Sequence, residues 1–312
     1  MRRAAVIVNP AARGGASLLA GHVASRLGET FDRVEVVPNA AAGGGVEAAR
    51  TAVASPGMEL IVAVGGDGTA REVAQGMAEG LGTWDGAASA DAGAPRLLIV
   101  PAGTGNSVHH ALWGDLPWPE SLALLERGAV VRRDLDLARI EGHGRAVLLG
   151  ASAGFLRWTV EATARFPELS GRELYATAGL AAAQELRPYA GRVSVDGEVV
   201  CEGPTALAVV GGARRRGGSL EVLPRSALDD GLLDVCVLCA RGADEAMGLL
   251  LLAMEGRHLE QPGVVYAQGR RITLECLDGP LPFEHDGDVW SGEEESLTLS
   301  VVPGAVPVVV PA

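Results

Sequence analysis

Three glycine-containing segments each follow a run of Val, Ile and Leu in the first third of this 312-residue chain. In a sheet of parallel strands the carboxyl ends of the strands share one edge, so segments that follow such strands converge there. Glycine lets the backbone approach a bound group closely, and the amino end of a helix offers unpaired N–H groups to an anion. The pattern therefore predicts a phosphate-binding crevice made by residues 9–15 (NPAARGG), 65–69 (GGDGT) and 101–106 (PAGTGN).

The segments around these turns alternate between two periodicities. Continuous apolar runs, typical of buried strands, occupy residues 3–10, 33–38, 59–66 and 95–103. Runs with helical spacing lie between them at residues 16–29, 45–55 and 69–80. Buried strands that alternate with helices predict an α/β domain whose parallel sheet is covered on both faces. We expect the Gly/Ala/Asp-rich residues 80–95 to form a mobile surface insertion.

Beyond about residue 134 the strands become shorter and turn signals more frequent. Residues 192–203 (RVSVDGEVVCEG) predict a hairpin that turns at Asp196-Gly197. Further strand-like runs lie at residues 205–212, 231–240, 264–269, 270–279 and 297–302, and helical runs at 172–186 and 243–256. We therefore expect an N-terminal nucleotide-binding α/β domain over residues 1–133, followed by an acceptor-binding, mainly antiparallel β domain over residues 134–295.

Composition excludes several classes of protein. The formal net charge is -13 and every basic residue is Arg, so nucleic-acid binding through clustered positive charge is not expected. No run is long and apolar enough to cross a bilayer, and we expect a cytoplasmic protein. Cys236 and Cys239, spaced like metal ligands, lie in a strand-like run where residues three apart face opposite sides, so core packing is the better interpretation.

The common nucleotide-binding fingerprints fail on residue type and spacing. A Walker loop and a protein-kinase strand both need a Lys, and the chain has none. The dinucleotide fingerprint Gly-x-Gly-x-x-Gly does not follow the first strand, which ends in Asn-Pro-Ala-Ala-Arg. The phosphate charge is then left to Mg2+ and to Arg side chains. Arg13 and Arg71 are the local candidates, the favoured alternative for each being an Arg on the surface.

With these motifs in place, the sequence resembles the diacylglycerol kinase catalytic-domain family, which includes bacterial soluble lipid kinases and sphingosine kinases. The resemblance rests on VNPAARGG, GGDGTAREV, VPAGTGNS, LEVLPRSALDDGLLDV and FEHDGDVW, which run along nearly the whole chain. It implies an NAD kinase/diacylglycerol kinase-like fold of two domains, with residues 296–312 returning to the first domain. It also implies phosphoryl transfer from ATP to a lipid hydroxyl.

The resemblance also implies roles for particular residues. Asp67 would border the nucleotide phosphates, and Glu72 would brace the loop or contact the nucleotide, the alternative for Glu72 being a carboxylate that satisfies helix N-terminal amides. The whole expected nucleotide site comprises Asn9, Arg13, Gly65, Gly66, Asp67, Gly68, Thr69, Glu72, Gly103, Thr104, Gly105 and Asn106.

An acceptor hydroxyl needs a carboxylate to position it or to take its proton. Asp196 is fully explained by a type I′ hairpin turn, whereas Asp286 in EHDGDVW matches the family's catalytic Asp-Gly-Glu position. We therefore expect Asp286 to be the general base. Asp288 stands where the family more often has Glu, and its shorter side chain leaves its catalytic role open.

Two further aspartates resemble metal ligands of the family. Asp136 matches an aspartate that reaches the catalytic Mg2+ through water, the alternative being a charge on an exposed strand face. Asp230, with the carbonyls of Ala227 and Leu232, matches a structural Mg2+ site, the alternative being an Asp-Gly turn. Ligation by oxygen alone suits Mg2+.

The acceptor is the least readable part of the sequence. We expect a lipid or lipid-like amphiphile such as diacylglycerol or a sphingoid base. The alternatives are a soluble acceptor such as NAD or a specialised metabolite, and a nucleotide-binding regulatory protein with weak catalysis. Residues 214–216 (RRR) are expected on a loop that either docks transiently on an anionic lipid surface, at the inner membrane face, or is simply solvated. Whether the protein forms a homodimer is left open by the sequence.

Overall fold

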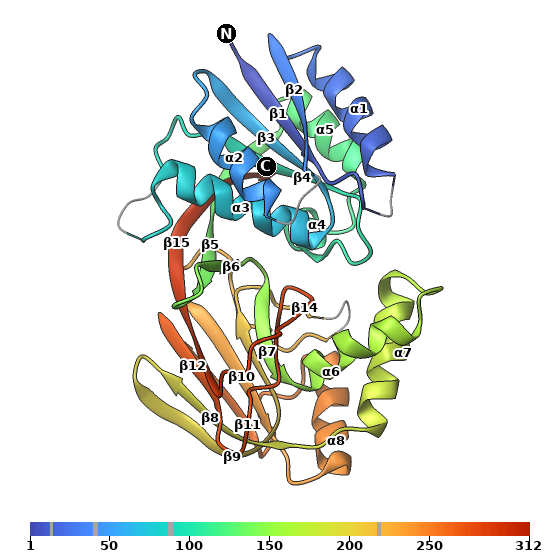
Figure 1. Cartoon of the computed structure of the whole chain (residues 1–312), viewed down its shortest axis with the longest axis vertical. Coiled ribbons are helices and arrows are strands. Elements are labelled where there is room, and N and C mark those ends of the chain that lie inside the picture. Colours follow the sequence, from blue (N-terminus) through green and yellow to red (C-terminus); the bar gives the residue numbers. More distant parts are fainter. Residues whose placement is uncertain (13–14, 40–42, 87–89, 217–219) are drawn as a thin grey trace. The chain divides into compact units, whose positions relative to one another are not determined.

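The computed structural model describes residues 1–12, 15–39, 43–86, 90–216 and 220–312 (Figure 1). The chain divides into two compact units. The N-terminal unit comprises Met1–Leu137 together with Val302–Ala312, and the β-rich unit comprises Ala138–Val301. The division expected near residue 133 falls inside the strand Val130–Ile140, which runs through the observed boundary four residues later, at Leu137.

The N-terminal unit contains a parallel sheet of strand order β2-β1-β3-β4-β15. Its strands are β1 (Arg3–Val8), β2 (Arg33–Pro38), β3 (Met58–Gly65), β4 (Arg96–Pro101) and the end of β15 (Ser296–Pro311), with β5 (Val130–Ile140) beside β15. Its helices are α1 (Ala16–Leu27), α2 (Gly44–Val53), α3 (Asp67–Leu81), α4 (Ser107–Trp113) and α5 (Trp118–Glu126).

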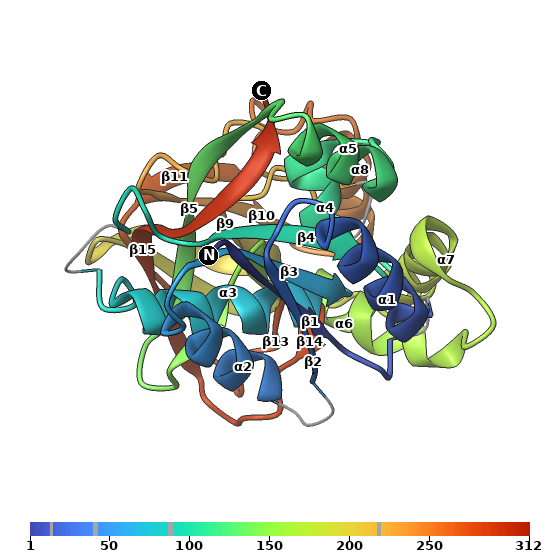
Figure 2. The same cartoon turned by 90° about the horizontal axis from the view of Figure 1, so that it is seen from above.

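Helices cover both faces of this sheet. Figure 2 shows α2 and α3 on one side of the strands and α1 with α5 on the other. Arg26 of α1 pairs with Glu126 of α5 at 2.5 Å, which ties the helices of that second side together. Strands β1, β3 and β4 are buried almost throughout, as their continuous Val/Ile/Leu runs require, whereas the edge strand β2 is partly exposed. The predicted α/β domain with a two-sided parallel sheet is confirmed.

The β-rich unit is antiparallel, with strand order β14-β13-β7-β9-β8-β12-β15, and β10 and β11 branch from β9. Its own strands are β6 (Arg145–Val147), β7 (Gly150–Gly154), β8 (Tyr189–Val195), β9 (Glu198–Gly211), β10 (Leu233–Cys239), β11 (Val264–Gly269), β12 (Arg271–Cys276), β13 (Phe283–His285) and β14 (Asp288–Val289). Its helices are α6 (Phe155–Ala162), the 3-10 turn η1 (Thr163–Arg165), α7 (Gly171–Gln184) and α8 (Ala243–Met254).

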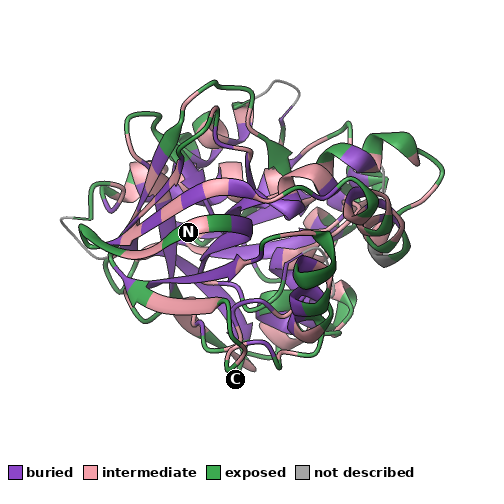
Figure 3. Cartoon of the chain, turned by 90° about the horizontal axis from the view of Figure 1, so that it is seen from below, coloured by how far each residue is buried: buried purple, intermediate pink, exposed green. Residues whose placement is uncertain are grey.

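Strand β10 shows why this unit has two hydrophobic cores. Val235 and Val237 belong to a core between strands, whereas Cys236 and Leu238 belong to a core that includes apolar residues of α6, α7 and α8. The strand is therefore buried on both faces, and Figure 3 shows strands largely buried while loops are exposed. Cys236 and Cys239 contribute to opposite cores, as predicted.

Two local expectations had different outcomes. The hairpin at Asp196-Gly197 joins β8 to β9, with φ of 50° and 89°, and is confirmed. The expectation of a mobile surface insertion is wrong for the start of residues 80–95, because Thr83 is fully buried and its hydroxyl donates to the Ala305 carbonyl at 2.8 Å. Along the described part of the chain, no helix is both long enough and apolar enough to span a membrane.

Candidate functional site

Asn9 shapes the turn that follows β1. Its backbone N–H donates to the Val64 carbonyl at the end of β3, at 3.2 Å. Its side-chain Oδ1 accepts the Ala11 N–H at 3.0 Å, which closes an Asx turn. The turn after β1 thus lies beside the end of β3, at one edge of the sheet. Arg13, predicted to contact phosphate, lies outside the described residues.

The glycines of the second turn differ in what surrounds them: some are closely packed and one faces open space. A Cβ placed on Gly65 would lie 2.3 Å from the Thr69 Oγ1, so the buried Thr69 side chain fills the space over this glycine. A Cβ on Gly103 would lie 2.4 Å from the Gly66 Cα, so the second and third turns pack backbone against backbone. A Cβ on Gly68, in contrast, would meet nothing within 4 Å. Gly68 therefore faces open space in the first turn of α3.

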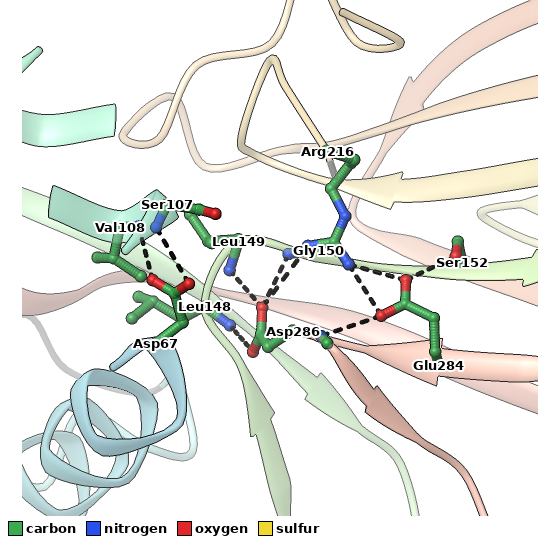
Figure 4. Close-up of polar contacts among 11 residues, drawn as sticks. Asp67, Ser107, Val108, Leu148, Leu149, Gly150, Ser152, Arg216, Glu284 and Asp286 are labelled. Carbon is green, nitrogen blue, oxygen red and sulfur yellow. Dashed lines mark hydrogen bonds and ion pairs between the residues drawn. The ribbon is translucent and has the colours of Figure 1, made fainter. Parts of the chain in front are cut away.

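Asp67, the acidic residue of GGDGT, binds the third turn. Its carboxylate accepts the N–H groups of Ser107 at 3.0 Å and Val108 at 2.9 Å, the first two residues of α4 (Figure 4). A carboxylate at this position satisfies helix amides that have no partner within the helix, and it suits the helix dipole. Asp67 was predicted to border nucleotide phosphates; here its carboxylate holds α4 against the second turn.

Asn106 closes the third turn on itself. Its backbone is left-handed, with φ of 53°, a conformation that Asn tolerates better than most residues. Its side-chain Oδ1 accepts the Gly103 N–H at 2.8 Å, and its Nδ2 donates to the Gly103 carbonyl at 2.9 Å. Thr104 and Gly105 lie within the loop that these two bonds close.

Glu72 lies on α3, but the amides that its carboxylate accepts belong to the segment that leads into α2. Its carboxylate accepts the Asn39 side-chain amide at 2.9 Å and the N–H groups of Gly43 and Gly45, both at 3.1 Å. These groups belong to the end of β2 and the start of α2. In this structure, Glu72 therefore anchors the start of α2 and does not brace the GGDGT loop.

In the β-rich unit, Asp286 and Gly287 form the turn between β13 and β14, with φ of 49° and 89°. The Asp286 Oδ1 accepts the N–H groups of Leu149 at 2.8 Å and Gly150 at 3.2 Å, and Oδ2 accepts that of Leu148 at 2.8 Å (Figure 4). Consecutive backbone N–H groups of this kind make an anion-binding concavity. The anion it holds is the side chain of Asp286, which is 1% exposed.

Three side chains that the sequence did not single out surround this turn. Glu284, on β13, accepts a hydrogen bond from Ser152 of β7 at 2.6 Å and from Arg216 at 2.8 Å. Arg216 was assigned only to a loop with its two arginine neighbours. The signal for β7 was present in residues 150–154 (GASAG), whose small residues allow close packing, but nothing in the sequence pairs this strand with β13.

Asp288, the second predicted catalytic residue, begins β14 and is exposed. It pairs with His285 across the hairpin. Asp288 is thus exposed, whereas the Asp286 side chain is buried. The role of Asp286 as general base stays a prediction, as does any catalytic role of Asp288.

The predicted metal ligands lie in two separate places. Asp136 is 8% exposed, which contradicts an exposed strand face, and its Oδ1 accepts the Gly304 N–H of β15 at 2.7 Å. Asp230 accepts the Leu232 N–H at 3.0 Å around Gly231, whose φ is 74°, and so forms an Asp-Gly turn. No group of three or more His, Cys, Asp or Glu among the described residues could hold a metal ion. Both Mg2+ sites, including the Ala227 carbonyl, stay predictions.

Comparison with known proteins adds to this geometry. The profile of the diacylglycerol kinase catalytic domain matches residues 3–138, and that of the YegS C-terminal NAD kinase beta sandwich-like domain matches residues 150–310. The chain is 31% identical to the "Probable lipid kinase YegS-like" of Pseudomonas aeruginosa (strain UCBPP-PA14), over 82% of this chain and 78% of that protein. It is 29% identical to the "Diacylglycerol kinase" of Mycobacterium tuberculosis (strain CDC 1551 / Oshkosh), over 98% and 94%.

A solved structure of a diacylglycerol kinase from Bacillus anthracis str. Sterne shares the fold, with a TM-score of 0.68 and 18% identity over 98% of this chain and 96% of that one. The chain is thus a phosphotransferase of the class that uses an alcohol group as acceptor. It belongs to the diacylglycerol kinase catalytic-domain family, in the branch that carries the YegS-type C-terminal domain.

Proposed function

We propose that this protein transfers the γ-phosphoryl group of ATP to a hydroxyl group of a lipid, such as diacylglycerol or a sphingoid base. One observation supports ATP as the phosphate donor. The second and third turns are held together by Asp67 and by the packing of Gly66 on Gly103, while Gly68 faces open space at the start of α3. The proposal of a lipid acceptor rests on the family, whose named relatives are lipid kinases.

The donor site fits a polyphosphate. The first amides of α3 have no partner within the helix. Among the described residues, a Cβ on Gly68 would meet nothing within 4 Å, so phosphate oxygens have room to approach the backbone there. Bound Mg2+ would neutralise phosphate charge, as phosphoryl transfer requires. Asp67 acts on this site indirectly, because it fixes α4 and the third turn beside α3.

At the acceptor site we propose Asp286 as the general base, with Oδ2 as the accepting atom. Oδ1 accepts two amide N–H groups, which uses both of its lone pairs, while Oδ2 accepts one. Oδ2 therefore has the capacity for one further hydrogen bond, which in this proposal the hydroxyl of a bound acceptor supplies. Asp288 is proposed as an exposed neighbour whose short side chain contacts water or metal.

The acceptor is tested by offering the purified protein ATP, Mg2+ and diacylglycerol or a sphingoid base in mixed micelles, with NAD in parallel. We expect ATP consumption with a lipid and none with NAD. The D286N variant should lower kcat by about 100-fold or more, the usual size of a general-base contribution, whereas D288N should lower it less. Phosphorylation of NAD alone would overturn the lipid assignment, and ATP binding without turnover of any acceptor would favour a regulatory protein.

The donor site is tested by a pair of glycine variants. G68A places a methyl group in the open space and should raise the KM for ATP by about 10-fold, while the better helix propensity of Ala keeps or raises stability by up to ~1 kcal/mol. G103A collides with Gly66 and should instead destabilise the fold by about 1–3 kcal/mol. An unchanged KM in G68A would remove Gly68 from the phosphate site.

A further inference from the structure

Arg216 and Glu284 form an ion pair inside the β-rich unit. The Arg216 Nη2 lies 2.8 Å from the Glu284 Oε1 and 3.1 Å from its Oε2, and the two side chains are 6% and 1% exposed. Taking both charges out of water costs several kcal/mol per ion, so such a pair contributes little net stability. A buried pair beside a predicted catalytic carboxylate therefore calls for a second explanation.

Glu284 holds the turn that carries Asp286. It lies two residues before Asp286 on β13, and its Oε2 accepts the Gly287 N–H at 3.1 Å. Its Oε1 accepts the Ser152 hydroxyl at 2.6 Å, which ties the turn to β7. With the Leu148–Gly150 amides on the Asp286 carboxylate itself, both residues of the turn are fixed (Figure 4).

Arg216 lies between two carboxylates. Its Nη1 is 3.9 Å from the Asp286 Oδ1, and its Nη2 donates to Glu284. Burial by itself lowers the pKa of Arg216, but the charges of Glu284 and Asp286 outweigh it and raise that pKa above its ordinary value. The guanidinium is therefore a permanent charge that faces Oδ1, the oxygen that already accepts two amides. Oδ2 accepts only the Leu148 N–H, at 2.8 Å.

The two arginines that precede Arg216 behave differently. Arg214 and Arg215 are 60% and 67% exposed, and both pair with the Glu221 carboxylate, at 3.4 Å and 3.1 Å. Three consecutive arginines are thus divided between a surface ion pair and a buried one. Two of the three arginines of the RRR segment therefore face solvent and one is buried, and docking of this segment on a lipid surface stays a prediction.

We propose that Arg216 and Glu284 are positioning residues for phosphoryl transfer, which hold the Asp286-Gly287 turn and direct the Oδ2 of Asp286 to the acceptor hydroxyl. This inference rests on the proposed function. Arg216 acts on Oδ1 by its charge, and Glu284 acts on the turn through the Gly287 N–H. Neither residue touches the acceptor in this arrangement.

The test compares R216Q, R216K and E284Q with R215Q, a charge-matched control from the same loop. Kinetics are measured with ATP and diacylglycerol or a sphingoid base in micelles of neutral detergent, after circular dichroism and urea unfolding have shown which variants fold. R216Q should lower kcat by about 30- to 100-fold and leave both KM values within about twofold, because a misplaced catalytic group affects the transition state alone. R216K should recover part of that loss, and R215Q should match the wild type.

Loss of folded molecules would also lower the apparent kcat without changing KM, so every kcat is expressed per folded molecule, with the folded fraction taken from the urea-unfolding curves. If R216Q does not fold, E284Q serves as the second variant, since Arg216 and Asp286 remain as a balanced pair. E284Q should lower kcat by about 10-fold through the lost hold on Gly287. The double variant R216Q/E284Q should lose more than either single variant but less than the product of the two losses, because the two side chains are hydrogen-bonded to each other and residues in contact are not additive.

Wild-type kcat in both folded R216Q and E284Q would overturn the inference while the proposed function stands. Absence of turnover in the wild type with every acceptor would instead overturn the proposed function, and the inference with it. A loss of activity in R215Q equal to that in R216Q would also overturn the inference, because it would assign the effect to the loop and not to the buried pair.

Discussion

The turn at Asp196-Gly197, which joins β8 to β9, and the turn at Asp286-Gly287, which joins β13 to β14, have nearly the same backbone. The φ angles are 50° and 89° in the first and 49° and 89° in the second. In both, the aspartate N–H donates to the carbonyl of a neighbouring residue whose own N–H donates back to the aspartate carboxylate. That residue is Arg271 for Asp196 and Gly150 for Asp286.

The surroundings of the two turns differ. Asp196 is exposed, and the nearby ion pair between Arg271 and Glu141 is 52% and 33% exposed. The Asp286 side chain is 1% exposed, and the ion pair beside it, between Arg216 and Glu284, is buried. Turn geometry alone therefore does not distinguish a structural aspartate from a candidate base. Burial and the neighbouring charges do.

The largest expected difference between the turns is in stability on loss of the carboxylate. D286A leaves the N–H groups of Leu148, Leu149 and Gly150 without that acceptor in a buried place, at about 1–3 kcal/mol for each unsatisfied group. We expect a loss of about 3 kcal/mol or more. D196A should cost less than about 1 kcal/mol, because water reaches the amides of Arg270 and Arg271. Urea unfolding of the two full-length variants measures the difference, and equal losses would show that burial is not what separates the turns.

An intermediate effect is expected from the glycines, and here the turns should agree in stability. G287A and G197A both force Ala to a φ of 89°, which costs about 1–2 kcal/mol. Neither new Cβ meets a close neighbour, since the nearest atom to Gly287 is the Tyr175 hydroxyl at 3.7 Å and none lies within 4 Å of Gly197. The same unfolding experiment should give equal losses, while only G287A should lower kcat. A much larger loss in G287A would mean that the two backbones are not equivalent.

The smallest effect on stability is expected from the exposed ion pair between Arg271 and Glu141, beside the Asp196 turn. The hydrogen bond from Arg271 lowers the pKa of Glu141 below its ordinary value of 4.5, with burial acting against it and the charge of Arg271 adding to it. Stability from this pair is thus complete above that ordinary value and is lost as the pH falls below it, through the pKa of the folded state. The contribution should stay below about 1 kcal/mol and weaken with salt, as for other exposed pairs.

Thermal unfolding of the wild type and of E141Q between about pH 3 and about pH 7, at low and high salt, measures this contribution. The two proteins should differ at neutral pH and low salt and converge at acid pH. A difference that persists in high salt would place the pair among the buried ones and remove the contrast with Arg216 and Glu284.

Much of the fold follows from local pattern. Continuous apolar runs such as residues 59–66 predict strands buried on both faces, and glycine-rich turns after them predict one shared edge, because parallel strands end together. The Asp196-Gly197 hairpin follows from turn chemistry between alternating residues. These are short-range rules, and the structure agrees with them.

The candidate sites depended more on contacts that sequence spacing cannot reveal. Asp67 binds the amides of residues 107 and 108, Glu72 those of residues 43 and 45, and Asp286 those of residues 148–150. Asp67 and Glu72 were predicted at the nucleotide site and Asp286 as the general base, and each accepts hydrogen bonds from amides in a distant part of the chain. Arg216 and Glu284, 68 residues apart, lie in segments that the sequence singles out, but no local signal predicts that they pair.

By itself, then, the sequence determined the two-domain α/β and β architecture, the shared edge of the three glycine turns and the family. Periodicity and turn residues act over a few positions, so they are readable along the chain. Only the tertiary structure decided which carboxylates are exposed, which are buried beside a charge, and which amides they bind. Two aspartates in the same turn, at 196 and 286, differ because of residues far away in sequence, and burial is a property of the packed fold.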